Sequence, residues 1–328
     1  MNKKELLIVN DLKLYFPIKG GFLGRTVNHV KAVDGISFTV HQGETVSLVG
    51  ESGCGKSTAG RAILRLEEPT AGEIIFDGDN LTSFSKKEMR SKRKEMQIIF
   101  QDPFASINPR QTAVQVLEEA LFIQDIVPRE QRRARAVELL KTVGLAAYQA
   151  DRYPHEFSGG QRQRIGIARA LSLNPQLIIC DEAVSALDVS IRAQILNLLI
   201  KLQKEFHLTY LFISHDLGVV RHISDRVIVM YLGRIMEIAS NKVLFHNARH
   251  PYTKALLSAI PVPRPGKKRE RIVLKGDVPS SIDPPPGCRF HTRCAYAQER
   301  CQEDIPELRS ANTPDQEHLV ACHFFETI

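Results

Sequence analysis

The residues best suited to chemistry stand together in Gly50–Ser57, whose sequence Gly-Glu-Ser-Gly-Cys-Gly-Lys-Ser fits the pattern G-x-x-x-x-G-K-[ST]. Glycines let such a loop curl until its backbone N–H groups point at phosphate oxygens, and a following helix adds its positive end. The Lys56 ammonium can then reach the β- and γ-phosphates, and the Ser57 hydroxyl can bind Mg²⁺. We therefore predict a nucleoside-triphosphate site formed by Gly50, Glu51, Ser52, Gly53, Cys54, Gly55, Lys56, Ser57 and Thr58.

Two carboxylates, Asp181 and Glu182, follow the apolar run Leu177–Cys180. The carboxyl end of a parallel strand is where ligands bind in open α/β sheets, so Asp181 is expected to hold Mg²⁺ through water. Glu182 is then placed as the general base for a water that attacks the γ-phosphate. An acidic pair after a strand is otherwise a helix cap, and the phosphate loop favours the catalytic interpretation.

Four further segments carry a family resemblance. Phe157–Gln161 is similar to the signature motif of the ATPase subunits of ABC transporters, and its first glycine lies 22 residues before Asp181, as in that family. Gln101 resembles the Q-loop glutamine, which contacts Mg²⁺ and the attacking water. Ser185–Asp188 resembles the D-loop, and His215 resembles the switch histidine that contacts the γ-phosphate. The resemblance covers about residues 6–250 and implies an ABC-type ATPase with the catalytic residues Gln101, Glu182 and His215.

The signature motif implies a dimer. Ser158 and the backbone of Gly159 and Gly160, ahead of a helix that starts near Gln161, form a second anion-binding helix end. In this family that surface closes over the ATP of a partner subunit, and Asp188 of the D-loop also belongs to the nucleotide site. Hydrolysis then removes contacts to the γ-phosphate and lets the pair reopen.

An aromatic side chain from the N-terminal strands is expected to stack on adenine. Tyr15 and Phe16 both stand where the family places it. Phe16 is the preferred candidate because Leu12, Leu14 and Phe16 share one face of a period-2 pattern. An aromatic residue of the sheet core is an equally good interpretation of that pattern.

The segment that follows position 250 resembles the ATPases of oligopeptide and dipeptide importers, and more closely the "F" type than the "D" type. The resemblance rests on His250–Pro261, Val33–Phe38 and Asp181–Ser190. It implies as partners a second ABC ATPase, two membrane permease subunits and, indirectly, a solute-binding protein. A nickel importer is a near relative. A soluble ABC-type ATPase and an iron–sulfur redox module with an accessory NTPase domain are further alternatives, although the chain has neither an internal repeat nor heptads.

Four of the six cysteines lie in the C-terminal segment, at Cys288, Cys294, Cys301 and Cys322. Disulfides are disfavoured in a cytosolic chain, so the cysteines are either metal ligands or unrelated small apolar residues. Four thiols within 35 residues, in a segment poor in long apolar runs, favour a metal site. The spacings are longer than those of most structural zinc sites and favour a [4Fe–4S] cluster, to which the resemblance also points. Zinc, with His291 or His323 as a substitute ligand, is the alternative, and Arg289, Arg293 and Arg300 are expected to offset the charge of the thiolates.

The elements that must position these residues are those of an α/β protein. Alternating residues over 5–48 predict antiparallel strands joined by a loop at Gly20, Gly21 and Gly24, and Val46–Val49 is a strand that leads into the phosphate loop. Continuous apolar runs at Leu177–Cys180, Tyr210–Ile213 and Val227–Met230 predict a parallel sheet covered on both faces. We predict an ABC-type ATPase domain over 1–250 with a helical subdomain at about 85–165, and a four-cysteine extension over 251–328.

Composition excludes a disordered chain, a collagen-like repeat and a membrane-spanning protein. The 328 residues hold 44 Lys and Arg against 37 Asp and Glu, a net charge of +7, and are 43% hydrophobic, which is typical of a globular chain. The basic clusters at Lys86–Lys94 and Arg129–Arg135 are mixed with glutamates, so solvated helix faces are favoured over a nucleic-acid site. Without a membrane-spanning run or a secretory signal, the chain is expected to be cytoplasmic. The resemblance to importer ATPases implies that it lies peripherally at the cytoplasmic face of the cell membrane.

Overall fold

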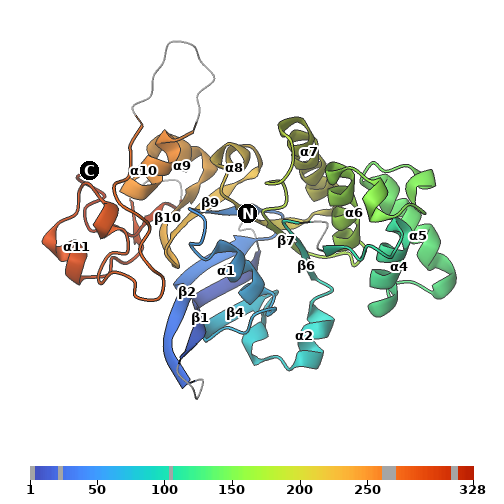
Figure 1. The fold of residues 1–328 in the computed structure, drawn as a ribbon, viewed down its shortest axis with the longest axis horizontal. Coiled ribbons are helices and arrows are strands. Elements are labelled where there is room, and N and C mark those ends of the chain that lie inside the picture. Colours follow the sequence, from blue (N-terminus) through green and yellow to red (C-terminus); the bar gives the residue numbers. More distant parts are fainter. Residues whose placement is uncertain (1–3, 21–24, 103–105, 261–270, 312–316) are drawn as a thin grey trace, which may run out of the picture. The chain divides into compact units, whose positions relative to one another are not determined.

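The computed structural model describes residues 4–20, 25–102, 106–260, 271–311 and 317–328. These residues form two compact units. The helical unit comprises Lys4, His41–Glu44 and the described residues of 83–213. The strand-rich unit comprises Glu5–Val40, Thr45–Thr82 and Ser214–Ile328. The two units are described separately below, and their elements are labelled in Figure 1.

The helical unit contains three parallel strands. They are β6 (Met96–Ile99), β7 (Leu177–Asp181) and β8 (Thr209–Ser214). Met96 pairs with Leu177, which in turn pairs with Thr209. Every residue of β7 and β8 is buried, as expected for parallel strands covered on both faces. The runs at Leu177–Cys180 and Tyr210–Ile213 are therefore confirmed as strands.

The helices of this unit begin at identifiable capping residues. Ser85 accepts a hydrogen bond from the Glu88 N–H, and the Glu88 carboxylate accepts one from the Ser85 N–H, which starts α2. The left-handed His207 ends α7. In Figure 1, α4, α5 and α6 lie side by side. The helices are α2 (Lys86–Lys92), α4 (Ala113–Ile123), α5 (Arg129–Thr142), α6 (Gly159–Leu171) and α7 (Val189–Phe206).

The strand-rich unit has an antiparallel sheet in the order β2, β1, β4, β5. Its long blue strands β1 and β2 form the N-terminal hairpin of Figure 1, as the alternating pattern predicted. Gly21 and Gly24 of the predicted connecting loop lie outside the described residues. The strands are β1 (Glu5–Gly20), β2 (Arg25–His41), β4 (Ala71–Phe76) and β5 (Asp79–Asn80).

The same unit holds the strand that leads into the phosphate loop. Strand β3 (Thr45–Val49) pairs in parallel with β9 (Arg226–Tyr231), and β9 continues antiparallel into β10 (Arg234–Ser240). The C-terminal segment extends this layer, because β12 (Leu319–Val320) pairs with β10 and with β11 (Arg309–Ser310). The helices of this unit are α1 (Lys56–Ile63), α8 (Leu217–Ile223), α9 (Asn241–Asn247), α10 (Pro251–Ser258) and α11 (Glu299–Glu303).

One hydrophobic cluster contains residues from both sides of position 250. Tyr231 of β9 and Tyr252 of α10 are buried in it together with Phe290 and Cys301 of the C-terminal segment. Burial of this apolar surface stabilises the C-terminal segment against β9 and β10. The division into 1–250 and 251–328 stays a prediction. No helix in the described part of the chain is both long and apolar enough to cross a membrane.

Candidate functional site

The phosphate loop joins β3 to α1 in the strand-rich unit. A Cβ at Gly50 would lie 2.2 Å from the carbonyl oxygen of Met230, and a Cβ at Gly55 would lie 2.0 Å from that of Ala32. Both distances are below any real contact, so glycine is required where the loop passes against neighbouring backbone. The loop ends at Gly55, the N-cap residue of the eight-residue helix α1, so its backbone lies at the positive end of that helix.

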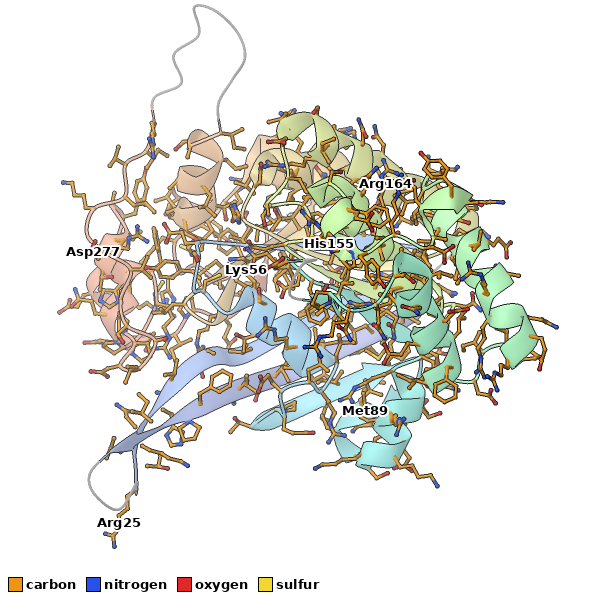
Figure 2. The ribbon with its side chains drawn as sticks, turned by 45° about the vertical axis from the view of Figure 1, so that its right-hand side comes forward. Arg25, Lys56, Met89, His155, Arg164 and Asp277 are labelled. Atoms are coloured by element: carbon orange, nitrogen blue, oxygen red, sulfur yellow. The ribbon has the colours of Figure 1, made fainter. Side chains whose placement is uncertain are left out.

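Lys56 is the cation of this loop, and Figure 2 labels it on α1. Lys56 as a whole is only 4% exposed to solvent. Its Nζ donates to the carbonyl oxygens of Gly50 and Glu51, each at 2.9 Å. A buried ammonium, a glycine-rich turn and a helix N-terminus are the donor set that phosphate groups require, so these residues fit the phosphates of ATP.

The predicted carboxylates lie in the helical unit. Asp181 ends β7 and is buried, and Glu182 follows it with a left-handed backbone, φ 48°. Such a φ is uncommon for a residue with a side chain and is found disproportionately at functional sites. The Glu182 N–H donates to the Ile213 carbonyl at 3.0 Å, which ties it to β8.

Gln101 and Glu182 are brought together. The Gln101 Nε2 donates to the Glu182 Oε2 at 3.0 Å, although 81 residues separate them. Gln101 follows β6, and β6 is the neighbour of β7, so both residues lie at the carboxyl edge of adjacent parallel strands. This hydrogen bond restricts the orientation of the Glu182 carboxylate, and its role as a general base stays a prediction.

The signature segment caps α6 in the helical unit. The Gln161 N–H donates to the Ser158 Oγ at 3.4 Å, and the Ser158 N–H donates to the Gln161 Oε1 at 3.0 Å. This reciprocal pair is a capping box. A Cβ at Gly160 would meet Ile191 of α7 at 2.4 Å, so the glycine allows α6 to pack closely. Asp188 is the N-cap residue of α7.

His215 follows β8 directly and is exposed. The next residue, Asp216, caps α8 by accepting hydrogen bonds from the N–H groups of Gly218 and Val219 at 2.9 and 3.3 Å. Because Asp216 provides the cap, the imidazole of His215 is not needed for it. Its role at a γ-phosphate stays a prediction.

The two candidates for adenine stacking differ in their surroundings. The Tyr15 Oη donates to the Asp34 Oδ1 at 2.5 Å, and burial together with Asp34 raises the pKa of Tyr15 to about 12. Phe16 is 38% exposed, whereas Leu12 and Leu14 are buried. The tyrosine is therefore held within the fold, and Phe16 remains the predicted stacking residue.

Asp34 is the centre of an ion cluster that the sequence did not reveal. Its Oδ2 accepts hydrogen bonds from Arg289 at 2.6 Å and Arg234 at 3.1 Å. Burial raises the pKa of this carboxyl, but Tyr15, Arg234 and Arg289 together outweigh it and lower the pKa to about 2. The cluster joins the N-terminal strands and β10 to the C-terminal segment.

This cluster predicts a loss of stability in acid. A carboxyl whose pKa is lowered by folding adds its full stability above its ordinary pKa of about 4, and that stability is lost as pH falls toward 2. We expect the difference in unfolding free energy between the wild type and Asp34→Asn to shrink by about 2 kcal/mol between pH 5 and pH 2. Urea unfolding at stepped pH measures it, and a difference that is constant over this range would contradict the pKa.

The predicted metal site in the C-terminal segment is wrong. Among the residues that the structure describes, no group of three or more His, Cys, Asp or Glu side chains is arranged to hold a metal ion. Cys288, Cys294, Cys301 and Cys322 are free thiols that line one cavity of about 20 Å³, room for about one water molecule rather than an iron–sulfur cube. Burial raises the pKa of Cys288 to about 12 and also raises those of Cys294 and Cys322.

The neighbours assigned to that metal site have other partners. The guanidinium groups of Arg289, Arg293 and Arg300 contact the carboxylates of Asp34, Glu51 and Asp304. The imidazoles of His291 and His323 lie 2.9 and 3.0 Å from the backbone carbonyl oxygens of Cys288 and Asp304. The cations therefore balance protein carboxylates, and the described residues support neither the predicted [4Fe–4S] cluster nor the zinc alternative.

Comparison with known proteins defines the class. The family model described as "ABC transporter" matches residues 33–185, and the one described as "Oligopeptide/dipeptide transporter, C-terminal region" matches residues 236–301. The chain belongs to the family of ABC transporter ATP-binding subunits, and it is an ATPase of the ABC type.

Two relatives from Bacillus subtilis (strain 168) match along nearly the whole chain. The oligopeptide transport ATP-binding protein AppF is 57% identical over 99% of this chain and 98% of its own. The putative oligopeptide transport ATP-binding protein YkfD is 52% identical over 99% and 97%. Among solved structures, the ATP-binding cassette MJ0796, a dimer bound to ADP and Pi, is similar with a TM-score of 0.64 and 30% identity, covering 72% of this chain and 99% of that one.

Proposed function

We propose that this chain is the ATP-hydrolysing subunit of an importer of oligopeptides or dipeptides. The observation that carries the proposal is the similarity to peptide-transport ATP-binding proteins over nearly the full length, including the C-terminal region at 236–301. The chain works at the cytoplasmic face of the membrane, with a second ABC ATPase and two permease subunits, and a solute-binding protein delivers the cargo.

The phosphate-binding residues come from the strand-rich unit. Lys56 binds the β- and γ-phosphates, the N–H groups of the loop 50–58 surround them, and Phe16 stacks on adenine. Ser57, Gln101 and Asp181 are the residues that would hold Mg²⁺, which neutralises charge on the phosphates when bound. The support for these roles is the buried Lys56 ammonium and the close backbone packing at Gly50 and Gly55.

Hydrolysis is assigned to the residues that follow β6, β7 and β8. A water oxygen forms a bond to the γ-phosphorus while the bond from that phosphorus to the bridging β–γ oxygen breaks, and Glu182 accepts the water proton. Gln101 orients the Glu182 carboxylate, and His215 contacts the γ-phosphate. The hydrogen bond between Gln101 and Glu182 supports this assignment.

The chain acts as half of a dimer. Ser158, Gly159, Gly160 and Gln161 at the N-terminus of α6, with Asp188, bind the ATP held by the partner's phosphate loop. The dimeric form of the similar cassette MJ0796 supports this arrangement. ATP then joins the two subunits, and its hydrolysis separates them.

Transport is tested with the intact assembly. The chain is co-purified with its permeases and its partner ATPase and placed in liposomes. ATP is supplied on the side of the ATPases, and the solute-binding protein and the labelled cargo are supplied on the opposite side. ATP-dependent accumulation of radiolabelled di- and oligopeptides is expected, and it should stop in the Lys56→Ala assembly. Accumulation of ⁶³Ni²⁺ without peptide uptake would replace peptide by nickel as the cargo, and stable ATPase activity without any permease in the purified material would favour a soluble ATPase.

A further inference from the structure

Glu51, the second residue of the phosphate loop, is held by the C-terminal segment. Its backbone N–H donates to the Tyr252 Oη at 2.9 Å. Its carboxylate accepts two hydrogen bonds from Arg293, at 2.7 Å from Nη1 to Oε2 and at 3.3 Å from Nη2 to Oε1. All three residues lie in the strand-rich unit, and more than 200 residues separate Glu51 from each of its two partners.

The Arg293 side chain is held in place by burial and by its contacts with Glu51 and Tyr231. Its side chain is 9% exposed, and its guanidinium lies 5.9 Å from the ring centre of Tyr231. Burial lowers the pKa of the guanidinium, but its bonds to Glu51 and Tyr231 outweigh burial and raise it. A bidentate pair between arginine and a carboxylate fixes orientation as well as distance, and shielding from water strengthens it.

Tyr252 is fixed from several sides. It is fully buried, and its ring packs against those of Tyr231 and Phe290 with centroids 4.8 and 5.3 Å away. Its backbone N–H donates to the Nδ1 of His250 at 3.1 Å. Burial lowers the pKa of His250 to about 4, so the neutral ring can accept this bond at neutral pH.

Glu51 also contacts Lys56, the cation assigned to bind the phosphates. The carbonyl oxygen of Glu51 accepts one of the two backbone-directed hydrogen bonds of the Lys56 ammonium, at 2.9 Å, and also faces the Cys54 N–H at 3.3 Å. Glu51 is therefore bonded through its N–H to Tyr252, through its carboxylate to Arg293 and through its carbonyl to Lys56. A displacement of Glu51 would move both the turn of the loop and the ammonium.

We propose that Arg293 and Tyr252 are positioning residues for ATP binding, which hold the phosphate loop ready through Glu51. The C-terminal segment thereby takes part in nucleotide affinity although it lies outside the ABC motifs. Without these contacts the loop would have to be ordered by ATP itself, and the lost entropy would be subtracted from the binding free energy. The proposal rests on the ATP-binding activity of the chain and is independent of the cargo.

Arg289 provides a matched control in the same segment. Its side chain is also 9% exposed and makes an ion pair of similar length, 2.6 Å, but with Asp34 rather than with the phosphate loop. Arg289→Ala and Arg293→Ala therefore remove the same buried cation type from the same segment. A role that is merely structural would give both variants the same effect.

The test is the dissociation constant of MgATP measured by isothermal titration on the full-length chain, well below the melting temperature of each variant. We expect Arg293→Ala to weaken binding about tenfold, and Arg293→Lys, which keeps one ionic contact, to recover about half of that loss on a logarithmic scale. Glu51→Gln in the Arg293→Ala background should raise the dissociation constant of MgATP by less than a further twofold, because Arg293 and the Glu51 carboxylate act through one shared contact. In the assembled transporter, KM for ATP should rise while kcat stays within about twofold.

Tyr252→Phe gives a second route, because it removes only the hydroxyl and keeps the packed ring. It should weaken MgATP binding about threefold and accelerate hydrogen exchange of the amides of residues 50–55. In the control variant Arg289→Ala, both the MgATP affinity and these exchange rates should equal those of the wild type. Wild-type affinity in both Arg293→Ala and Tyr252→Phe, or an equal loss in Arg289→Ala, would overturn the proposal. A wild-type chain that binds no ATP would instead remove the assigned function.

Discussion

The Glu182→Gln variant is expected to bind MgATP with wild-type affinity and to hydrolyse it about 10² to 10⁴ times more slowly, the range that a general base contributes. The side chains have the same shape, and an amide can still accept the hydrogen bond that Gln101 Nε2 donates at 3.0 Å. Only the proton-accepting carboxylate is lost. Steady-state phosphate release measures the rate, and size-exclusion chromatography with MgATP is expected to show an accumulated dimer because the joined state no longer decays.

Two features make this result decisive. Glu138→Gln, on the exposed surface of α5 in the same unit, removes a carboxylate of equal charge and should leave turnover unchanged. Glu182→Gln also keeps the backbone of a residue with φ 48°, so a change in loop conformation is not introduced. Turnover in Glu182→Gln equal to that of the wild type would exclude Glu182 as the base.

The second large effect is expected at Lys56. Lys56→Ala removes the only ammonium on the phosphate loop's own sequence, and it leaves the carbonyl groups of Gly50 and Glu51 without its two hydrogen bonds at 2.9 Å. We expect MgATP binding to weaken at least about tenfold and hydrolysis to fall about 10²- to 10³-fold. This is the loss of rate that follows when one preorganised hydrogen-bond donor to the negative charge of a transition state is removed. Titration calorimetry and phosphate release measure the two effects separately.

Lys13→Ala is the control for Lys56→Ala. Lys13 lies on β1 of the same unit and pairs with the exposed carboxylate of Asp11 at 2.8 Å. Loss of this surface pair costs at most about 1 kcal/mol of stability and should not affect ATP. If Lys56→Ala retained wild-type affinity and rate, the phosphate-site assignment would be wrong.

Local sequence predicted those parts of the site whose chemistry depends on neighbouring residues. The order of Gly50, Gly55 and Lys56 is enough to predict a phosphate loop, because strand, turn and helix N-terminus follow one another in the chain. The runs that became β7 and β8 were also identifiable, because strands buried on both faces need continuous apolar residues. Strand β6 was missed within the helical segment expected over 85–165, because four residues, Met96–Ile99, give no period of their own.

The cysteines show the opposite case. Spacing and the family resemblance both suggested a common ligand set, but neither reports how the side chains are arranged in the fold, where no group of three or more His, Cys, Asp or Glu among the described residues is arranged to hold a metal ion. Nor does either report that Arg289 and Arg293 have carboxylate partners more than 240 residues away in the chain. Charge that looks unbalanced in a sequence can be balanced by a distant strand or loop.

The sequence by itself determined the enzyme class: the phosphate-loop motif predicts an NTPase from residue type and order, and the resemblance of four further short segments to the ABC family implies the particular class. Only the tertiary structure decided which residues contact those segments: Gln101 donates a hydrogen bond to Glu182, and Arg293 and Tyr252 of the C-terminal segment are hydrogen-bonded to Glu51. The reason is physical. A motif specifies local backbone geometry, whereas contacts between residues 81 or more than 200 positions apart arise only when the whole chain packs, and no local pattern encodes their partners.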